Sequence, residues 1–408
     1  MSCSRGNMNI RCLQCKGRHL CGRSFCPIQA KISAQKKVNI EAKQDYFGES
    51  PNVFVGHYGY PNLNVGFLNV EEYNNHDAPL LWSKEGYDIN RIIDLRSQLI
   101  NSQFKAEVKD ARKSDKLIDM GKEIAMASEP VDVEINLEKV PHFNLNFGQE
   151  TAPHGPSVKL KKAEITENPK IPNHVEKVVD DDIKATDGLN LLYDKGFDEQ
   201  YLTKLLSVGT LGMQKDKKIV PTRWSITAVD DSLFKHLLES IKQYPEIDYS
   251  AYFGSHLGNY YLILMFPDAW SYELFETYVG SAEYEWPFST DYEGCNGRKE
   301  YASNTAGGYY AARLAVAEKL AEKKRQGSCL CLRFITNEYW APLGVWVVRE
   351  AARNSMASKP LEFGSKELML NYARHIVKRK FGYNLDNILG KSILLKQSKE
   401  QTKLMSFL

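Results

Sequence analysis

Long hydrophobic runs are missing from this 408-residue sequence. No stretch approaches the ~18 uncharged apolar residues that a membrane-spanning helix needs. Arg5 and Arg11 near the N-terminus are not followed by the apolar core of a signal peptide. These absences exclude an integral membrane protein and predict a soluble, cytoplasmic one.

Acidic residues are absent from the first 40 positions, which hold eight lysines and arginines. The whole chain is nearly balanced, with 53 basic and 51 acidic residues, so the remainder is mildly acidic. Bulk composition therefore does not indicate a polyanionic partner, but the basic N-terminal segment does. We expect Arg11, Lys16, Arg18 and Arg23 to contact nucleic-acid phosphates there.

Cysteine is scarce beyond residue 26, where only three of the eight cysteines occur. This distribution argues against a disulfide framework. Cys12, Cys15, Cys21 and Cys26 instead supply four thiolates within 15 residues, the ligand set of a closed, structural Zn²⁺ site. Two alternatives remain open: the thiols are free, or the zinc only staples the chain end while its charges are solvated.

The chain as a whole predicts a mixed α/β fold with a basic, four-cysteine zinc module at 1–40, a larger α/β core at 41–390 and a flexible clamp-binding tail at 391–408. A proline-rich, charged connection is expected near 150–187 and divides the core into possible subdomains. We expect one long helix from about 90 to 127 and strands at 131–145 and 223–229. Further helices are expected at 232–243, 309–324 and 365–380, and further strands at 252–253, 260–266 and 329–335.

The last eight residues form a short motif of their own. Gln401, Leu404, Phe407 and Leu408 fit the sliding-clamp-binding pattern of a glutamine, an aliphatic residue three positions later and two large apolar residues at the end. In a 3₁₀ turn, residues three apart project together, so Leu404 and Phe407 form one plug for an apolar pocket. The alternative is a tail that folds back onto its own domain.

Two internal segments carry candidate ligand-binding groups. His57, Tyr58 and Tyr60 lie in a glycine-bounded loop suited to stacking on a base, or else form an aromatic-packed turn. Candidate ligand groups also lie at the two ends of an expected strand, where α/β proteins place them: Arg223, Trp224, Asp230 and Asp231. The alternative there is a core Trp224, a solvated arginine and a helix-capping Asp230–Asp231 pair.

Three other features have no settled chemistry. Gly307 and Gly308 open an expected helix whose amides suit a phosphate, but no nucleotide-binding glycine motif accompanies them. Asp291 and Glu293 are interpreted as surface acids in preference to nuclease metal ligands. Arg96 joins His57, Arg223 and Asp231 as a candidate catalytic residue.

Four sequence blocks together resemble the archaeal NreA family: CLQCKGRHLCGRSFCP at 12–27, FVGHYGYP at 54–61, PTRWSITAVDD at 221–231 and GGYYAAR at 307–313. The resemblance spans nearly the whole chain. It implies a DNA-repair protein that binds the clamp PCNA through the C-terminal motif and acts on damaged or crosslinked DNA. The family's cysteine motif corresponds to Cys12, Cys15, Cys21 and Cys26, and no catalytic residue is implied.

The function expected from the sequence is therefore a clamp-tethered DNA-repair factor that contains structural Zn²⁺ and contacts DNA. Two alternatives come from other classes. One is an enzyme acting on nucleic acid or a nucleotide cofactor, such as a nuclease or an NAD-using transferase. The other is an RNA-binding zinc protein.

Overall fold

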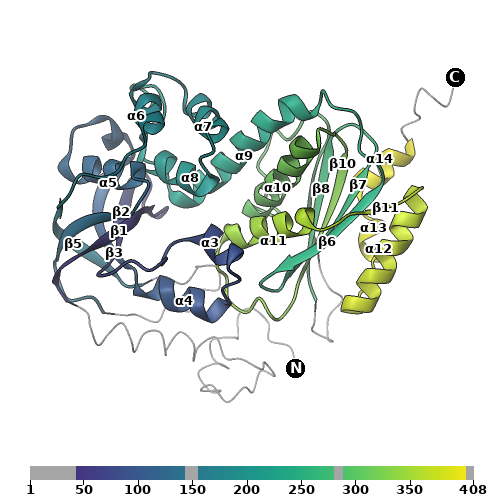
Figure 1. Cartoon of the computed structure of the whole chain (residues 1–408), viewed down its shortest axis with the longest axis horizontal. Helices are drawn as coiled ribbons and strands as arrows, with labels where there is room; N and C mark the ends of the chain where they lie inside the picture. Colours follow the sequence, from purple (N-terminus) through teal and green to yellow (C-terminus); the bar gives the residue numbers. More distant parts are fainter. Residues whose placement is uncertain (1–42, 143–154, 280–287, 401–408) are drawn as a thin grey trace, which may run out of the picture. The chain divides into compact units, whose positions relative to one another are not determined.

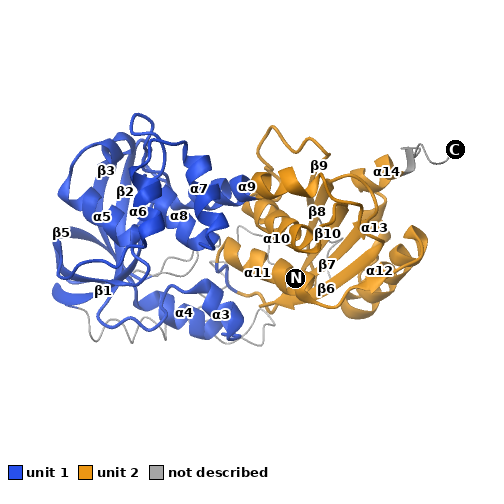
Figure 2. Cartoon of the chain, turned by 45° about the horizontal axis from the view of Figure 1, so that its top comes forward, with its two compact units in different colours: residues 1, 3–233, 341–343 blue, residues 2, 234–340, 344–408 orange. Residues whose placement is uncertain are grey.

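The computed structural model describes residues 43–142, 155–279 and 288–400, which divide into two compact units (Figures 1 and 2). Unit 1 reaches Leu233 and unit 2 begins at Phe234, apart from a three-residue exchange at Ala341–Leu343. The boundary lies inside a helix, α9 (Thr222–Ile241). It does not lie in the expected connection at 150–187, which instead contains strand β5 (Ser157–Ile165) and helix α6 (Asn173–Asp180).

Unit 1 is built on a closed five-stranded barrel. Its strands are β1 (Asp45–Val55), β2 (Asn62–Val70), β3 (Ile100–Glu107), β4 (Val131–Leu137) and β5, in the order β1-β2-β3-β5-β4. β3 and β5 pair in parallel and the other neighbours are antiparallel. This order and the parallel closure are those of the OB barrel.

The barrel core follows from alternation along the strands. In β4 every second residue is buried, which places Val131, Val133, Ile135 and Leu137 inside. Helix α5 (Lys116–Met126), between β3 and β4, contributes Ile118 and Ile124 to the same core. Asp115 caps α5 by accepting from the Leu117 and Ile118 amides.

Unit 1 also contains several shorter helices. They are α3 (Pro79–Lys84), α4 (Ile89–Gln98), the 3₁₀ helix η1 (Val108–Arg112), α7 (Ala185–Asp194) and α8 (Glu199–Val208). The single helix expected from 90 to 127 is therefore wrong. Ile100, Ser102, Phe104 and Ala106 alternate inward along β3, so the barrel selects a strand at this point.

Unit 2 is a six-stranded sheet in the order β11-β6-β7-β10-β8-β9. The strands are β6 (Ser250–His256), β7 (Asn259–Phe266), β8 (Ser271–Tyr278), β9 (Phe288–Glu293), β10 (Ser328–Ile335) and β11 (Leu361–Glu362). Every residue of the central β10 is buried, as expected for a strand covered on both faces. The strands expected at 252–253, 260–266 and 329–335 are confirmed.

Helices cover both faces of this sheet (Figure 1). α10 (Gly307–Lys323) and α11 (Val345–Ala357) lie on one face; α12 (Lys366–Phe381), α13 (Asp386–Leu389) and α14 (Ile393–Glu400) pack with the core of the other. Ser365 caps α12 as expected, by accepting from the Leu368 amide at 3.3 Å. Among the described residues, no helix is long and apolar enough to cross a membrane.

Helical structure continues beyond residue 390, into the first part of the tail expected at 391–408. Glu273 of β8 accepts hydrogen bonds from the Ile393 and Leu394 amides at 2.9 and 3.1 Å. Leu394 and Leu395 are buried in the core. The start of α14 is therefore fixed to unit 2, and the last eight residues follow directly after its end at Glu400.

Candidate nucleic-acid interface

The β1–β2 loop presents aromatic side chains at one end of the barrel. Gly59 has a φ of +86°, and a Cβ there would lie 2.8 Å from the Asn62 carbonyl oxygen, so the turn requires glycine. The loop leaves Tyr58 78% and Tyr60 55% exposed. The His57 and Tyr58 rings lie 4.0 Å apart, centroid to centroid.

The first turn of α9 brings a second segment to this loop. The Val55 amide at the end of β1 donates to Thr222 Oγ1 at 2.9 Å. Trp224 then lies beside Tyr60, with ring centroids 5.5 Å apart, and remains 46% exposed. We call His57, Tyr58, Tyr60 and Trp224 the barrel-end aromatic cluster.

Trp224 and its neighbours differ from the expectation of a strand at 223–229. Ser225, Val229 and Leu233 are buried at four-residue spacing, which is helical. The β-branched and aromatic residues here favour a strand locally, but packing of one face overrides that preference. Trp224 is consequently a surface residue, so the core-tryptophan alternative is wrong, and Arg223 next to it is exposed.

Outward-facing residues extend the surface from the loop across the barrel. Phe54 on β1 lies opposite Gly66 on β2, which lies opposite Gln103 on β3. One step nearer the loop, Asn64 pairs with the exposed Lys105. An exposed phenylalanine, two amides and a lysine thus border the aromatic cluster. In OB barrels, the β2–β3 face and the β1–β2 loop are the parts that bind oligonucleotides.

The remaining candidate catalytic residues have other environments. Arg96 forms an ion pair with Asp77 at 2.8 Å, and Asp77 also accepts from Asn52 of β1, which ties α4 to the barrel. Asp231 lies two helical turns beyond Trp224, about 10 Å along α9. His57 therefore belongs to the cluster and Arg223 adjoins it in the chain, whereas Arg96 is held by a carboxylate.

Two acids interpreted as surface residues are buried in unit 2, so that interpretation is wrong. Asp291 accepts from the amide and hydroxyl of Thr305, both at 2.8 Å. Glu293 pairs with Arg313 at 2.6 Å and accepts from the Trp270 indole. A cation or hydrogen-bond donors already contact each of these carboxylates. The two carboxylates therefore link β9 to neighbouring segments of unit 2. The described residues contain no cluster of three or more His, Cys, Asp or Glu side chains suited to a metal.

Lys204 on α8 is a titratable group that the sequence did not single out. Burial lowers the pKa of its ammonium to about 8, although Asp77 and Asp198 oppose the shift. The ammonium donates to the carbonyl oxygens of Pro51 and Ala127, each at 3.4 Å. No pattern of spacing marks such a lysine, because its environment comes from three separate segments.

Several predicted site residues lie outside the described residues. They are the zinc ligands Cys12, Cys15, Cys21 and Cys26, the basic residues Arg11, Lys16, Arg18 and Arg23, and the clamp-motif residues Gln401, Leu404, Phe407 and Leu408. Zinc, the N-terminal phosphate contacts and clamp binding all stay predictions.

Comparison with known proteins identifies the family. Models described as "Archaeal Nre, N-terminal" and "Archaeal Nre, C-terminal" match residues 20–285 and 293–407. The chain belongs to the archaeal Nre family. The N-terminal Nre model extends past unit 1 into β6, β7 and β8, so the junction of the two models falls within the sheet of unit 2.

Curated relatives within the Nre family match over most of their length. The chain is 38% identical to DNA repair protein NreA of Archaeoglobus fulgidus, over 91% of this chain and 95% of that protein. It is 34% identical to DNA repair protein NreB of the same organism, over 96% and 98%. DNA repair protein NreA of Haloferax volcanii is 36% identical over 76% and 77%. No solved structure matches the chain significantly.

Proposed function

We propose that this chain is a DNA-repair factor that binds DNA through the barrel-end aromatic cluster and is tethered to the sliding clamp PCNA by residues 401–408. The names of the three relatives support the repair role. The observation that carries the DNA contact is the exposed Tyr60–Trp224 pair at the β1–β2 loop of an OB-type barrel.

The chemistry of this surface favours single-stranded or locally unpaired DNA. Exposed rings stack on unpaired bases irrespective of sequence, at about 1–3 kcal/mol per base. The exposed Arg223, which adjoins Trp224 in the chain, and the exposed Lys105, opposite Asn64, suit backbone phosphates. The Cys-rich N-terminal segment adds eight basic residues around four thiolates that suit structural Zn²⁺. Damaged DNA exposes unpaired bases more readily than intact duplex, because unstacking costs less there.

Anisotropy with a labelled 16-nucleotide single strand tests the DNA contact. Tyr60→Ala with Trp224→Ala should weaken binding by about tenfold or more, since two stacking partners are lost. Arg223→Gln should lower the salt slope by about one. Tyr278→Ala, which removes an aromatic side chain that is 65% exposed in unit 2, is the matched control and should bind normally. Unchanged affinity in the double variant would remove the basis of the interface.

Charge reversal of Arg11, Lys16, Arg18 and Arg23 separates the contribution of the N-terminal segment. If that segment contacts phosphates, the variant loses affinity and salt dependence together. If it acts only as a zinc-stapled end, the variant binds as the unmodified protein does.

Calorimetry with the clamp tests the tether. A protein lacking residues 401–408 should lose binding, and Phe407→Ala should cost about 2 kcal/mol or more, as for a buried aromatic anchor. α14 ends at Glu400 and its start is bonded to Glu273, so a bound clamp would lie close to unit 2. Equal clamp affinity with and without residues 401–408 would refute the tether.

A further inference from the structure

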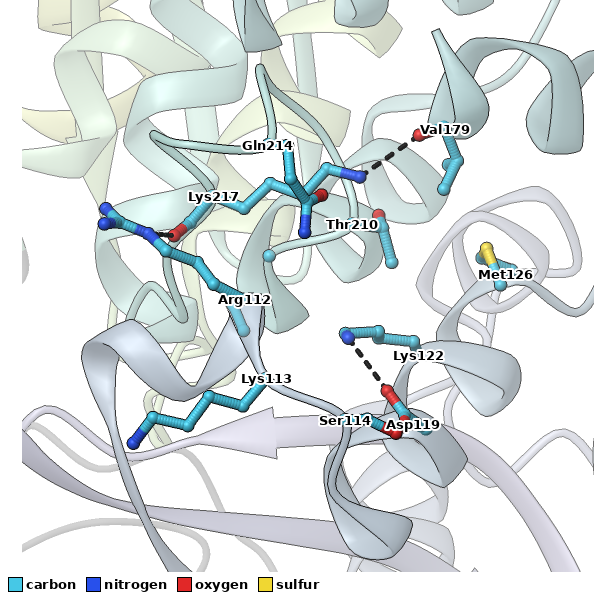
Figure 3. A pocket seen from close by; sticks show the side chains of 12 residues that line it. Arg112, Lys113, Ser114, Asp119, Lys122, Met126, Val179, Thr210, Gln214 and Lys217 are labelled. Atoms are coloured by element: carbon cyan, nitrogen blue, oxygen red, sulfur yellow. Dashed lines mark hydrogen bonds and ion pairs between the residues drawn. The ribbon is translucent and has the colours of Figure 1, made fainter. Parts of the chain in front are cut away.

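A pocket of about 370 Å³ in unit 1 is lined by more basic residues than acidic ones. Figure 3 shows basic side chains around it from η1, from α5 and from the segment that follows α8. Arg112, Lys113, Lys122 and Lys217 line the pocket, together with the single carboxylate Asp119 and the hydroxyls of Ser114 and Thr210.

Carboxylates compensate only two of these four cations. Lys122 pairs with Asp119 at 2.9 Å, and Lys113 pairs with Asp110 at 2.7 Å. Arg112 Nε donates to the Lys217 carbonyl oxygen at 2.9 Å, and Lys217 Nζ donates to the Val179 carbonyl oxygen at 3.1 Å. Within the described part of the chain, Arg112 and Lys217 have no carboxylate within salt-bridge distance.

The electrostatics of Lys217 agree with an anion site. Burial and the nearby charge of Lys122 both lower the pKa of Lys217, against the pull of Asp180 and Asp182. Holding two ammonium groups near one another costs free energy unless an anion lies between them. A bound anion would reverse that cost.

We propose that this basic pocket binds a phosphomonoester, supplied either by the terminal phosphate of a DNA strand or by a free nucleotide. A phosphomonoester carries about −1.5 to −2 charges at pH 7, which matches the two uncompensated cations. A guanidinium and an ammonium from different segments are the groups that recognise such an oxyanion. The Ser114 hydroxyl already donates to Asp119 at 3.3 Å and the Thr210 hydroxyl to the Leu205 carbonyl oxygen at 2.9 Å, so the two cations carry the recognition.

If the phosphate is the terminal phosphate of a DNA strand, one strand would contact both the pocket and the aromatic cluster. Only this connection rests on the proposed function. Lys217 precedes Trp224 by seven residues, which span at most about 25 Å. The chain between them is held in place, because the Ile219 amide donates to the Val108 carbonyl and the Val108 amide donates to the Pro61 carbonyl. OB barrels occupy about 4–16 nucleotides, so one short strand can reach both places.

Calorimetric titration of the full chain with inorganic phosphate, at constant ionic strength set by chloride, tests the pocket without DNA. We expect saturable binding that Lys217→Gln and Arg112→Gln each weaken by about tenfold, the loss of one charge-assisted contact. Lys116→Gln is the matched control, because this exposed lysine of α5 pairs with Glu164 outside the pocket. Thermal melting of each variant establishes that it is folded.

Absence of phosphate binding, or phosphate affinity in the folded Lys217→Gln or Arg112→Gln variant that equals the affinity of the unmodified protein, would overturn the proposal. Titration with dAMP and with 12-nucleotide strands carrying a 5′-phosphate, a 3′-phosphate or hydroxyl ends then separates the sources. Tighter binding of a phosphorylated strand, lost in Lys217→Gln, assigns the pocket to strand ends. Binding of dAMP without any gain from strand phosphorylation assigns it to a free nucleotide. Loss of strand binding in the Tyr60/Trp224 variant with phosphate binding retained separates the pocket from the aromatic interface.

Discussion

The hydrogen bond between the Val55 amide and Thr222 Oγ1 predicts a variant that disturbs the aromatic cluster without touching it. Thr222→Val keeps the shape of the side chain and removes the acceptor. Val55 is only 1% exposed, so its amide loses its partner in a place that water reaches poorly. An orphaned buried donor costs about 1–3 kcal/mol, and we expect about 1–2 because Thr222 itself is half-buried.

The loss should be visible in both stability and DNA binding. For a unit of this size, each kcal/mol lowers the melting temperature by about 2–4 °C. Because Trp224 is two residues beyond Thr222, the indole should also leave Tyr60, which changes tryptophan fluorescence and weakens strand binding. Thr222→Ser retains the hydroxyl and should restore both properties. If Thr222→Val melts and binds DNA as the unmodified protein does, α9 is positioned by other contacts and the reasoning is wrong.

Three further predictions concern other parts of the chain. Glu293→Ala removes the carboxylate that pairs with Arg313 at an almost fully buried site and should cost about 3–5 kcal/mol by denaturant unfolding, with Glu293→Gln less damaging. Burial lowers the folded-state pKa of Lys204 from 10.5 to about 8, so the unfolded chain binds more protons than the folded chain between these two pH values. The free energy of unfolding should therefore rise with pH in this range. Lys204→Met should remove that rise in thermal melts from pH 7 to 10.5. Metal analysis should find one zinc per chain, lost when Cys12→Ser and Cys26→Ser are combined.

Local pattern was sufficient for the fold where a turn or a helix cap adjoins an apolar element. The β6–β7 hairpin was predictable because Leu257 and Gly258 form a positive-φ turn between two apolar strands. α12 was predictable because Ser365 supplies a cap before a periodic apolar face. These signals are contained within about ten residues, so no distant contact is needed to recognise them.

Sequence reasoning failed where tertiary contacts decide between two local preferences. The 90–127 segment has helical spacing at its start, but barrel closure requires Ile100–Glu107 as a strand between β2 and β5. Asp291 and Glu293 resemble surface acids in sequence because their partners, Thr305 and Arg313, come from later segments. Neither outcome leaves a local trace that single-sequence reasoning can use.

The candidate interface illustrates both situations in one place. The glycines and aromatic residues of the β1–β2 loop leave two interpretations open on sequence alone, stacking on a base or an aromatic-packed turn, and the structure leaves Tyr58 and Tyr60 exposed. Trp224 lies beside Tyr60 for a reason that a strand end at 223–229 does not supply, because its position depends on a hydrogen bond that joins residues 167 positions apart. The block PTRW at 221–224 cannot be assigned to the interface from sequence alone. Helix α9 must begin beside the end of β1 for its first turn to face the β1–β2 loop. The pocket formed by Arg112, Lys122 and Lys217 is a stronger case: each is an ordinary surface lysine or arginine in sequence, and only the fold gathers their charges around one cavity.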